Sequence, residues 1–442
     1  MKKRFRILLH SMIFKRDLGT IYILANLLEN LGCECFIANN TNYMSIISKL
    51  WNPHAVLYVT LSRTKGLRQY FPHAKLFLYS AEAGDGKKLS RELPIIEDEF
   101  LFNTISRVYL WGNSVKEILL ERRENLGSSN FLWKMEDSVR DKFIVAGNPH
   151  LDKIKYAQPL NDIHKHKKIK IGFIGKFNYI NKKRSDRLLR IILNYNPNDP
   201  NFELGTNQML FQIKLLSCYC YIIEKLGCKD YSFSIRPYVA EELDSYSKSR
   251  TVMNGKLEID NSIDFSTWVS QQDILIGSIS TTIAQIAMAK KTFIALDLLN
   301  DSKLRDYQRN IIPTMKENCP ENYEELFYII ENFKEFRLPS PSLKIILDSY
   351  YNFNKKDSVL LTVAQDIVKN IEKENVTRNM RIPENIFNLI SYFNVRYNEI
   401  VKAKHHKKSY SYFNSGMLKI QSSKEFDSIV KNIIKQNYGN PN

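Results

Sequence analysis

One segment, residues 273–297, restricts the fold of this chain more than any other. Its sequence is Asp-Ile-Leu-Ile-Gly-Ser-Ile-Ser-Thr-Thr-Ile-Ala-Gln-Ile-Ala-Met-Ala-Lys-Lys-Thr-Phe-Ile-Ala-Leu-Asp, which predicts a buried strand, a turn of hydroxyl residues, a helix and a second buried strand. In such a crossover unit a ligand lies outside the carboxyl ends of the parallel strands. Ser280, Thr281 and Thr282 are therefore candidates for holding a nucleotide phosphate or a sugar acid, because a helix N-terminus favours anions. An ordinary capped helix is the alternative.

The length and composition of the chain indicate a folded protein of more than one domain. A chain of 442 residues is too long for one ordinary core, and its content of 44% hydrophobic residues is typical of a globular protein. The formal net charge of +17, from 64 Lys and Arg against 47 Asp and Glu, suits anionic partners such as nucleotide phosphates, an anionic membrane face or nucleic acid. A solvated basic surface without a partner is the alternative.

Apolar strands alternate with helical periodicity through the first 300 residues, which predicts an α/β protein with doubly wound parallel sheets. The basic stretch 161–170 is poor in large apolar side chains and is typical of a linker, after which the strand pattern restarts. Three parts are expected: domains over residues 1–165 and 166–345, then a basic helical extension over 346–442. The spacing at 357–374 predicts a helix within that extension.

Other features of the sequence bear on compartment and metals. No apolar segment is long enough to span a bilayer, and the N-terminal residues are typical of a first strand rather than a signal peptide. We expect a cytoplasmic protein, with the basic aromatic stretch 375–442 as a candidate contact with the inner face of an anionic membrane or with a carrier lipid. A solvated tail is the alternative for this stretch. The six cysteines form no C-x-x-C pair, and His164 and His166 have no third ligand nearby, so no metal is expected.

Six short motifs occur along the chain in a fixed order. They are Arg-Asp-Leu-Gly at 16–19, Leu-Tyr-Ser-Ala-Glu-Ala-Gly at 78–84, Leu-Trp-Gly-Asn-Ser-Val-Lys at 110–116, Gly-Asn-Pro-His-Leu-Asp at 147–152, Ile-Arg-Pro-Tyr at 235–238, and the hydroxyl-rich segment 278–287. Each motif alone is weak. Together they resemble the bacterial surface carbohydrate biosynthesis proteins, a group of GT-B glycosyltransferases that includes retaining β-Kdo transferases using CMP-Kdo.

The resemblance spans roughly residues 1–300 and implies a fold, an activity and partners. It implies two Rossmann-like domains facing a cleft, with the acceptor side in the first and the nucleotide sugar in the second. The implied donor is a nucleotide-activated sugar, Kdo or a related ulosonic acid, without a cofactor or metal. The implied acceptor is a surface glycan or a glycolipid. Three positions depart from the family's pattern: His150 stands in place of Arg, Tyr238 in place of His, and Gln285 in place of an acid.

The resemblance also implies roles for individual residues. Asp152 is the expected nucleophile of a retaining transfer and Glu82 the expected acid/base, although these roles are interchangeable. The residues expected to bind the donor and stabilise its leaving phosphate are Arg236, Ser278, Ser280, Thr281, Thr282, Gln285, Lys176 and Asn178. Asn148, His150, Arg16 and Asp17 are expected to contact the acceptor or support the site. The alternatives are a capping role for Asp152, an ion pair of Glu82 with Lys87 or Arg91, and a structural ion pair for Arg236.

Other functions stay open at this level. A polyol-phosphate transferase or a nucleotide-sugar epimerase would share the same two-domain architecture. A non-catalytic assembly protein on a decayed transferase fold is a third alternative, favoured by Gln285 and Tyr238. Nucleic-acid binding is not expected, because the sequence carries no zinc motif, helix-turn-helix or aromatic RNA-binding signature. No P-loop motif is present either, which argues against an ATPase.

Overall fold

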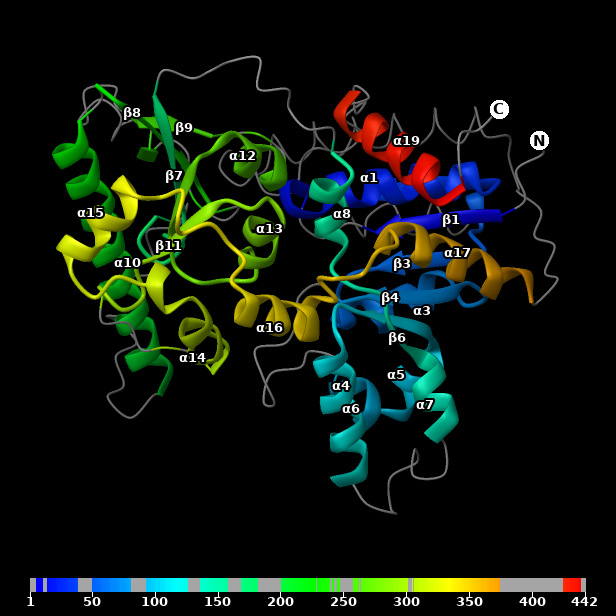
Figure 1. Cartoon of the computed structure of the whole chain (residues 1–442). Coiled ribbons are helices and arrows are strands. Elements are labelled where there is room, and N and C mark those ends of the chain that lie inside the picture. The colour runs from blue at the N-terminus through cyan, green and yellow to red at the C-terminus, as the bar shows by residue number, and fades with distance from the viewer. Residues whose placement is uncertain are drawn as a thin grey trace, which may run out of the picture. The chain divides into compact units, whose positions relative to one another are not determined.

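The structure is a computed structural model, and it divides into two compact units (Figure 1). It describes residues 5–10, 14–38, 50–80, 93–125, 136–157, 168–181, 200–227, 229–238, 241, 245–246, 257–260, 262, 264–300, 304, 306–373 and 424–438. The first unit comprises residues 1–158 together with 347–442, and the second comprises residues 159–346. Each unit has its own sheet and its own hydrophobic core.

The first unit is built on a parallel sheet of six strands. These are β1 (Phe5–His10), β2 (Cys33–Ala38), β3 (Ala55–Tyr58), β4 (Lys75–Tyr79), β5 (Ile105–Leu110) and β6 (Phe143–Val145), in the spatial order β2-β1-β3-β4-β5-β6. Every pair of neighbouring strands is parallel, as in the register that places Phe5 opposite Cys33. The strands are mostly apolar because helices cover a parallel sheet on both faces.

The helices of the first unit come from both ends of the chain. Its first part contributes α1 (Phe14–Asn30), the 3₁₀ turn η3 (Leu61–Arg63), α3 (Thr64–Tyr70), α4 (Leu93–Glu97), α5 (Glu99–Thr104), α6 (Asn113–Asn125), α7 (Glu136–Lys142) and α8 (Pro149–Lys155). Its last part contributes α17 (Val359–Glu372) and α19 (Lys424–Tyr438). Both of these late helices pack against α1 and α8. The segment expected to be an appended extension therefore supplies two packed helices of the first unit.

Polar contacts fix α19 to the first unit in addition to its buried apolar face. Ile429, Val430 and Ile433 are buried. Tyr22 Oη on α1 donates a hydrogen bond of 3.0 Å to Asp427 Oδ1, and Asn432 Nδ2 donates one of 2.8 Å to the carbonyl of Tyr156. One apolar stripe with polar edges is the pattern that docks an amphipathic helix.

The second unit repeats the plan with a parallel sheet of five strands. The strands are β7 (Ile169–Ile174), β8 (Tyr231–Arg236), β9 (Leu257–Ile259), β10 (Ile274–Gly277) and β11 (Thr292–Ala295), in the order β11-β10-β7-β8-β9. Its helical segments are α10 (Pro200–Leu226), α12 (Phe265–Gln271), α13 (Ile283–Met288), α14 (Asp306–Ile311), the 3₁₀ segment η4 (Ile312–Asn318) and α15 (Tyr323–Glu331). Helix α16 (Pro341–Tyr351) contains the division between the units. The two parallel α/β sheets confirm the predicted fold class.

Strand order indicates where each sheet offers a binding site. In the first sheet the chain goes from β1 outward to β2 on one side and continues through β3 to β6 on the other. In the second sheet it leaves β7 for β8 and β9 on one side, then returns to β10 and β11 on the other. Ligands of open α/β sheets bind beyond the carboxyl ends of the strands at such a reversal. The two expected places are therefore beyond β1 and β3, and beyond β7 and β10.

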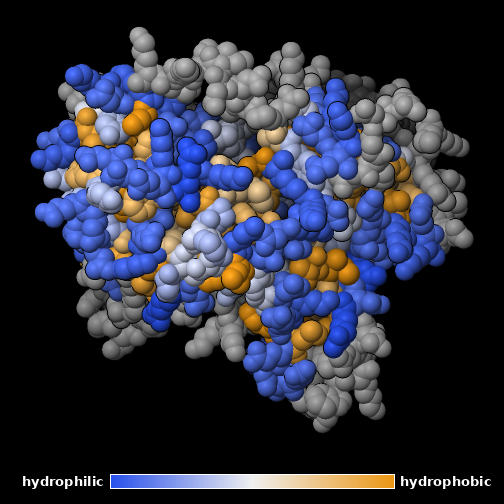
Figure 2. Space-filling view, in the orientation of Figure 1, coloured by the Kyte–Doolittle hydropathy of each residue, from blue (hydrophilic) through white to orange (hydrophobic). Residues whose placement is uncertain are grey.

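The surface is predominantly polar on the face shown in Figure 2, where hydrophobic residues occupy scattered areas among hydrophilic ones. The large apolar side chains of the strands lie inside instead, as with Phe77 and Tyr109 in the first unit and Phe173 and Phe233 in the second. Among the helices that the structure describes, none combines the length and the apolar character needed to cross a membrane.

Gly112 provides a test of the packing between β5 and the late part of the chain. A Cβ atom on Gly112 would lie 2.5 Å from the carbonyl oxygen of Tyr350 and in contact with the backbone of Ser349. We expect Gly112→Ala to lower the free energy of unfolding by about 1–3 kcal/mol, because the clash is with backbone. The matched control is Gly66→Ala in α3, where a Cβ meets nothing within 4 Å. That variant is expected to gain up to about 1 kcal/mol in urea unfolding; equal effects of the two variants would contradict the packing described.

Candidate functional site

The turn that follows β10 in the second unit is held by a buried acid, Asp297. We call residues 278–282 the hydroxyl turn. Asp297 Oδ1 accepts a hydrogen bond of 2.7 Å from Ser278 Oγ, and Asp297 Oδ2 accepts one of 2.8 Å from the backbone N–H of Ile279. Gln308 Nε2 also donates to Asp297 Oδ1, at 2.7 Å. Asp297 thus ties the start of the hydroxyl turn to the end of β11 and to α14.

The charge balance around Asp297 includes Lys176 from the loop after β7. Burial raises the pKa of the Asp297 carboxyl, while Lys176 and the donors of the turn act in the opposite direction. Lys176 Nζ lies 3.1 Å from Ser278 Oγ and donates to it. The sequence analysis assigned no role to Asp297, although its place directly after an apolar strand was a signal for it. Two of the expected donor residues, Lys176 and Ser278, are thereby brought together beyond β7 and β10.

The remaining hydroxyls of the turn are less buried. Ser280 Oγ and Thr282 Oγ1 share a hydrogen bond of 2.7 Å, and Thr281 is partly exposed. Thr282 precedes α13 but makes no side-chain cap. Gln285 is buried on α13, where its Nε2 donates to Ser266 Oγ at 3.1 Å. The amide of Gln285 therefore connects α13 to α12.

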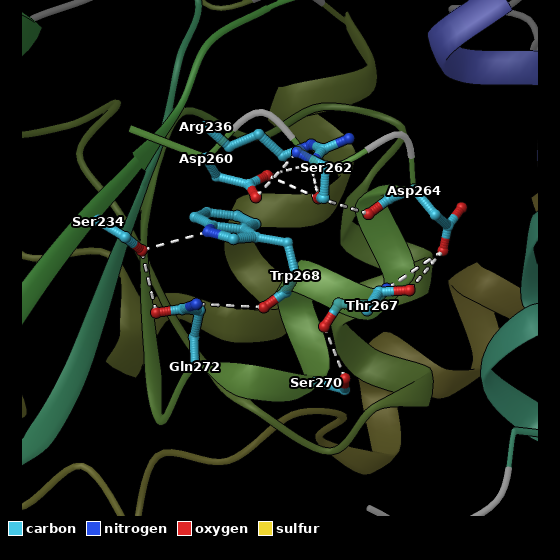
Figure 3. Close-up of polar contacts among 9 residues, drawn as sticks. All are labelled: Ser234, Arg236, Asp260, Ser262, Asp264, Thr267, Trp268, Ser270 and Gln272. Atoms are coloured by element: carbon cyan, nitrogen blue, oxygen red, sulfur yellow. Dashed lines mark hydrogen bonds and ion pairs between the residues drawn. The ribbon is translucent and has the colours of Figure 1, made fainter. Parts of the chain in front are cut away.

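Arg236, at the end of β8, is paired with an acid of its own unit. Its Nη1 forms an ion pair with Asp260 and a hydrogen bond of 2.7 Å with Ser262 Oγ (Figure 3). The Arg236 guanidinium also lies 5.7 Å from the ring centre of Phe265. Asp260 also accepts from the backbone N–H of Ser262 at 3.1 Å. The sequence analysis gave two possible roles for Arg236, donor binding and a structural ion pair. This geometry is that of the structural ion pair. Any anionic ligand of Arg236 competes with the Asp260 carboxylate.

A second set of polar contacts fixes α12 beneath the Arg236 pair. Trp268 Nε1 donates to Ser234 Oγ at 3.2 Å, and Ser234 Oγ donates to Gln272 Oε1 at 3.1 Å (Figure 3). Asp264 caps the helix by accepting from the backbone N–H of Thr267 at 3.1 Å. Hydrogen bonds thus connect the carboxyl-terminal part of β8 to α12 and hold this helix in place.

The loop after β7, residues 175–181, is shaped by two buried side chains. Gln212 on α10 accepts from the backbone N–H of Tyr179 at 2.9 Å, and its Nε2 donates to Asn178 Oδ1 at 3.0 Å. Glu241 accepts from the backbone N–H of Phe177 and from the hydroxyl of Tyr246. Asn178 therefore holds its own loop in place through Gln212.

Glu241 makes the stability of the second unit depend on pH. Burial raises its pKa from 4.5 to about 7, against the opposing effect of its hydrogen bonds. A carboxyl with a raised pKa binds more protons in the folded state, so its contribution to the free energy of unfolding falls as pH rises from about 4.5 to about 7. We expect the stability of the wild type relative to Glu241→Gln to fall by up to about 3 kcal/mol between about pH 5 and pH 8. Urea unfolding of both proteins at each pH measures this difference.

The control for this measurement is Glu258→Gln on β9, whose side chain is exposed in the same unit. Its difference from the wild type should stay nearly constant over the same pH range. A Glu241→Gln difference that is equally constant would contradict the burial of a proton-binding carboxyl at this position.

In the first unit, Asp152 binds the N-terminus of α17. The carboxylate is 1% exposed and accepts hydrogen bonds from Ser358 Oγ at 2.7 Å, Val359 N at 3.2 Å and Leu360 N at 2.8 Å. Burial raises the pKa of Asp152, and these donors act against the rise. Helix N-termini favour carboxylates because their first N–H groups are unpaired. The geometry gives Asp152 a capping function on a helix distant in sequence, so its role as nucleophile stays a prediction and draws no support from this arrangement.

Asp152→Asn distinguishes the two roles. An amide keeps one acceptor oxygen and turns an NH₂ group toward the N–H donors of α17, so we expect a loss of about 1–3 kcal/mol in the free energy of unfolding. The control Asp357→Asn, at an exposed neighbouring acid, should change stability little. A nucleophile without a structural role would instead show unchanged urea unfolding for Asp152→Asn together with loss of turnover.

The residues around Asp152 line a pocket beyond the carboxyl ends of β1, β3 and β4. We call it the β1 pocket; its lining includes His10, Asp17, Tyr79, Ser80, Trp111, His150 and Leu360. Asn148 lies beside it and caps α8, with its Oδ1 accepting from His150 N at 2.9 Å. His150 Nδ1 lies 3.0 Å from Thr20 Oγ1 on α1. The structure therefore brings Asp17 and His150 together at the expected reversal of the first sheet.

His10 is one of the residues of this pocket to which the sequence analysis gave no role. It ends β1 and is buried, although it is polar. The available signal was a polar residue directly after the apolar strand Phe-Arg-Ile-Leu-Leu.

Two of the predicted residues are not placed by the structure. Glu82 lies outside the described residues, and of Arg16 only the backbone, within α1, is described. Within the described part of the chain, no group of three or more His, Cys, Asp or Glu side chains is arranged to hold a metal ion.

Comparison with known proteins connects this geometry to a fold. No protein-family model matches the chain, and no curated protein matches it in sequence. Among solved structures, MnaA from S. aureus with UDP is similar with a TM-score of 0.51 at 10% identity, covering 86% of this chain and 100% of that chain. A variant of the wall teichoic acid polymerase TagF is similar with a TM-score of 0.50 at 11% identity, covering 85% and 91%. The chain has a GT-B fold.

A third similar structure is a putative UDP-N-acetylglucosamine 2-epimerase from Listeria monocytogenes, at 10% identity and a TM-score of 0.49, covering 86% of this chain and 100% of that chain. At identities this low the likeness is one of fold.

Proposed function

We propose that the protein is a GT-B glycosyltransferase that moves a sugar from a nucleotide onto a hydroxyl of a glycan or glycolipid. The observation that carries the proposal is the hydroxyl turn at the reversal of the second sheet, fixed by Asp297 and reached by Lys176. Open α/β sheets bind ligands at this place. The GT-B fold supports it, and the similar structure of MnaA contains UDP. The nucleotide sugar is a co-substrate, and the proposal includes no further cofactor.

The proposed chemistry uses the turn as the site of the leaving phosphate. The acceptor hydroxyl attacks the anomeric carbon, a new C–O bond forms, and the bond from that carbon to the nucleotide phosphate breaks with its electron pair on the phosphate. Backbone N–H groups and the hydroxyls of Ser280 and Thr281 donate to the phosphate, and Lys176 contributes positive charge. Glu82 stays the candidate that takes the acceptor's proton. We name CMP-Kdo, or the CMP derivative of a related ulosonic acid, as the first donor to test and a UDP-sugar as the second.

Nucleotide binding is the direct test of the hydroxyl turn. We expect millimolar UDP or CMP to raise the melting temperature of the wild type, because a ligand that binds only the folded state stabilises it. The double variant Ser280→Ala, Thr281→Val should weaken nucleotide binding about a hundredfold or more, since hydrogen bonds to a charged phosphate each contribute about 1.5–3 kcal/mol and about 1.4 kcal/mol corresponds to a factor of about ten. Differential scanning fluorimetry across a nucleotide titration measures both effects.

The control variant is Ser270→Ala on α12, whose hydroxyl donates to the carbonyl of Thr267. It should bind nucleotide as the wild type does. If neither nucleotide shifts the melting temperature, the proposed function fails. If the double variant and the wild type bind equally, the nucleotide does not lie at the hydroxyl turn.

A nucleotide-sugar epimerase is the second candidate, because it would share the same two-domain GT-B fold. Product analysis separates the two reactions. An epimerase converts the nucleotide sugar without an acceptor, whereas a transferase releases free nucleotide and lengthens the acceptor.

A further inference from the structure

Two residues that line the β1 pocket each carry a buried polar atom that lacks a hydrogen-bond partner among the residues the structure describes. The two atoms are His10 Nδ1 and Trp111 Nε1. Both residues line the pocket, and each side chain is only 3% exposed. Buried polar atoms in folded proteins are nearly always paired, so an unpaired one requires an explanation. Two of them on the lining of one pocket, at the reversal of a parallel sheet, indicate a ligand that completes their hydrogen bonds.

The chemistry of the two atoms restricts that ligand. The Trp111 indole N–H is a donor only and requires an acceptor. Burial lowers the pKa of His10 to about 4, helped by Arg63 and opposed by Asp17, so its imidazole is neutral near pH 7. A neutral imidazole carries one donor and one acceptor nitrogen. A hydroxyl group both donates and accepts, and therefore fits both positions.

The rest of the lining restricts the charge and shape of the ligand. Leu9, Leu24 and Leu57 give the pocket apolar walls. Asp17 and Arg63 bring charges of opposite sign close to His10, and the apolar walls disfavour a charged ligand because a charge taken out of water is costly unless it is paired. Apolar walls with a few convergent polar groups are typical of sites for small organic ligands. The combination suits a neutral carbon skeleton with several hydroxyls better than it suits a phosphate.

We propose that the β1 pocket binds a neutral polyhydroxylated group, a pyranose ring or a polyol, whose hydroxyls pair with His10 Nδ1 and Trp111 Nε1. If the protein has the proposed function, this group is part of the acceptor of glycosyl transfer, and this part of the inference rests on that function. The pocket's preference for a neutral polyol follows from the first unit alone.

Saturation-transfer NMR on the full chain tests the site with methyl β-D-galactopyranoside, methyl α-D-glucopyranoside and glycerol as neutral probes and D-glucuronate as the anionic one. We expect at least one neutral probe to bind, and glucuronate to bind more weakly than the glucopyranoside. His10→Phe and Trp111→Phe should each reduce binding of the neutral probe at least tenfold, because each removes one polar atom and keeps a ring. Saturating UDP should leave the probe signal in place.

The matched controls are a histidine and a tryptophan of the same unit whose ring nitrogens already have hydrogen-bond partners within the protein. His54 Nδ1 accepts from the backbone N–H of Arg6 at 3.0 Å, and Trp51 Nε1 donates to Glu34 Oε1 at 2.8 Å. His54→Phe and Trp51→Phe should lose thermal stability but keep probe binding within twofold. His10→Phe should melt at or above the temperature of His54→Phe, because it breaks no hydrogen bond to a described residue. If His10→Phe does not fold, His10→Leu replaces it.

Three results would overturn the proposal: no neutral probe binds, binding survives both pocket variants, or glucuronate binds as well as the glucopyranoside. The nucleotide titration on the same samples separates this proposal from the proposed function. Nucleotide binding without probe binding removes the polyol site and leaves the transferase. Probe binding at the pocket without nucleotide binding keeps the site and removes the transferase.

Discussion

The first unit depends on the contact between the Asp152 carboxylate and the start of α17. One buried carboxylate satisfies two backbone N–H groups and the hydroxyl of Ser358, so it joins α8 to a helix from the far end of the chain. Leu360 takes part twice, because its N–H donates to Asp152 and its side chain lines the β1 pocket. The position of α17, and with it one wall of the pocket, follows from this cap.

The second unit uses the same device in a different place. Asp297 is fully buried and holds the first residues of the hydroxyl turn from the end of the neighbouring strand. Arg236 is likewise occupied by Asp260. In both units buried acids fix loops or helix ends, while hydroxyl and imidazole groups lie beyond the carboxyl ends of the strands together with Lys176 in the second unit and Asp17 in the first. A site of this kind recognises its ligand mainly through directed hydrogen bonds, and its loops keep their shape because buried acids anchor them.

Local sequence was sufficient for the architecture and insufficient for the contacts. Apolar runs and helical spacing predicted the two parallel sheets and helix α17, since each signal lies within a few residues; β9, with three residues, is too short to give one. The partners of Asp152 lie more than 200 residues away along the chain, so no local pattern reveals that it caps α17. Arg236 and Gln285 acquire their partners through tertiary packing in the same way. Lys176 and Ser278 lie side by side because β7 and β10 are neighbouring parallel strands whose carboxyl ends meet at one edge of the sheet.

The first unit is discontinuous in sequence, with the whole second unit inserted between α8 and α17. A ribosome therefore completes the first sheet early but delivers α17 only after every strand of the second unit has been made. Until then Asp152 has none of its three hydrogen-bond donors. The surface of α1 against which α17 and α19 pack is not yet covered by these two helices. The inserted unit, continuous in sequence, is free to fold first. Synthesis order thus makes the first unit, which contains the N-terminus, the last of the two to have all its helices.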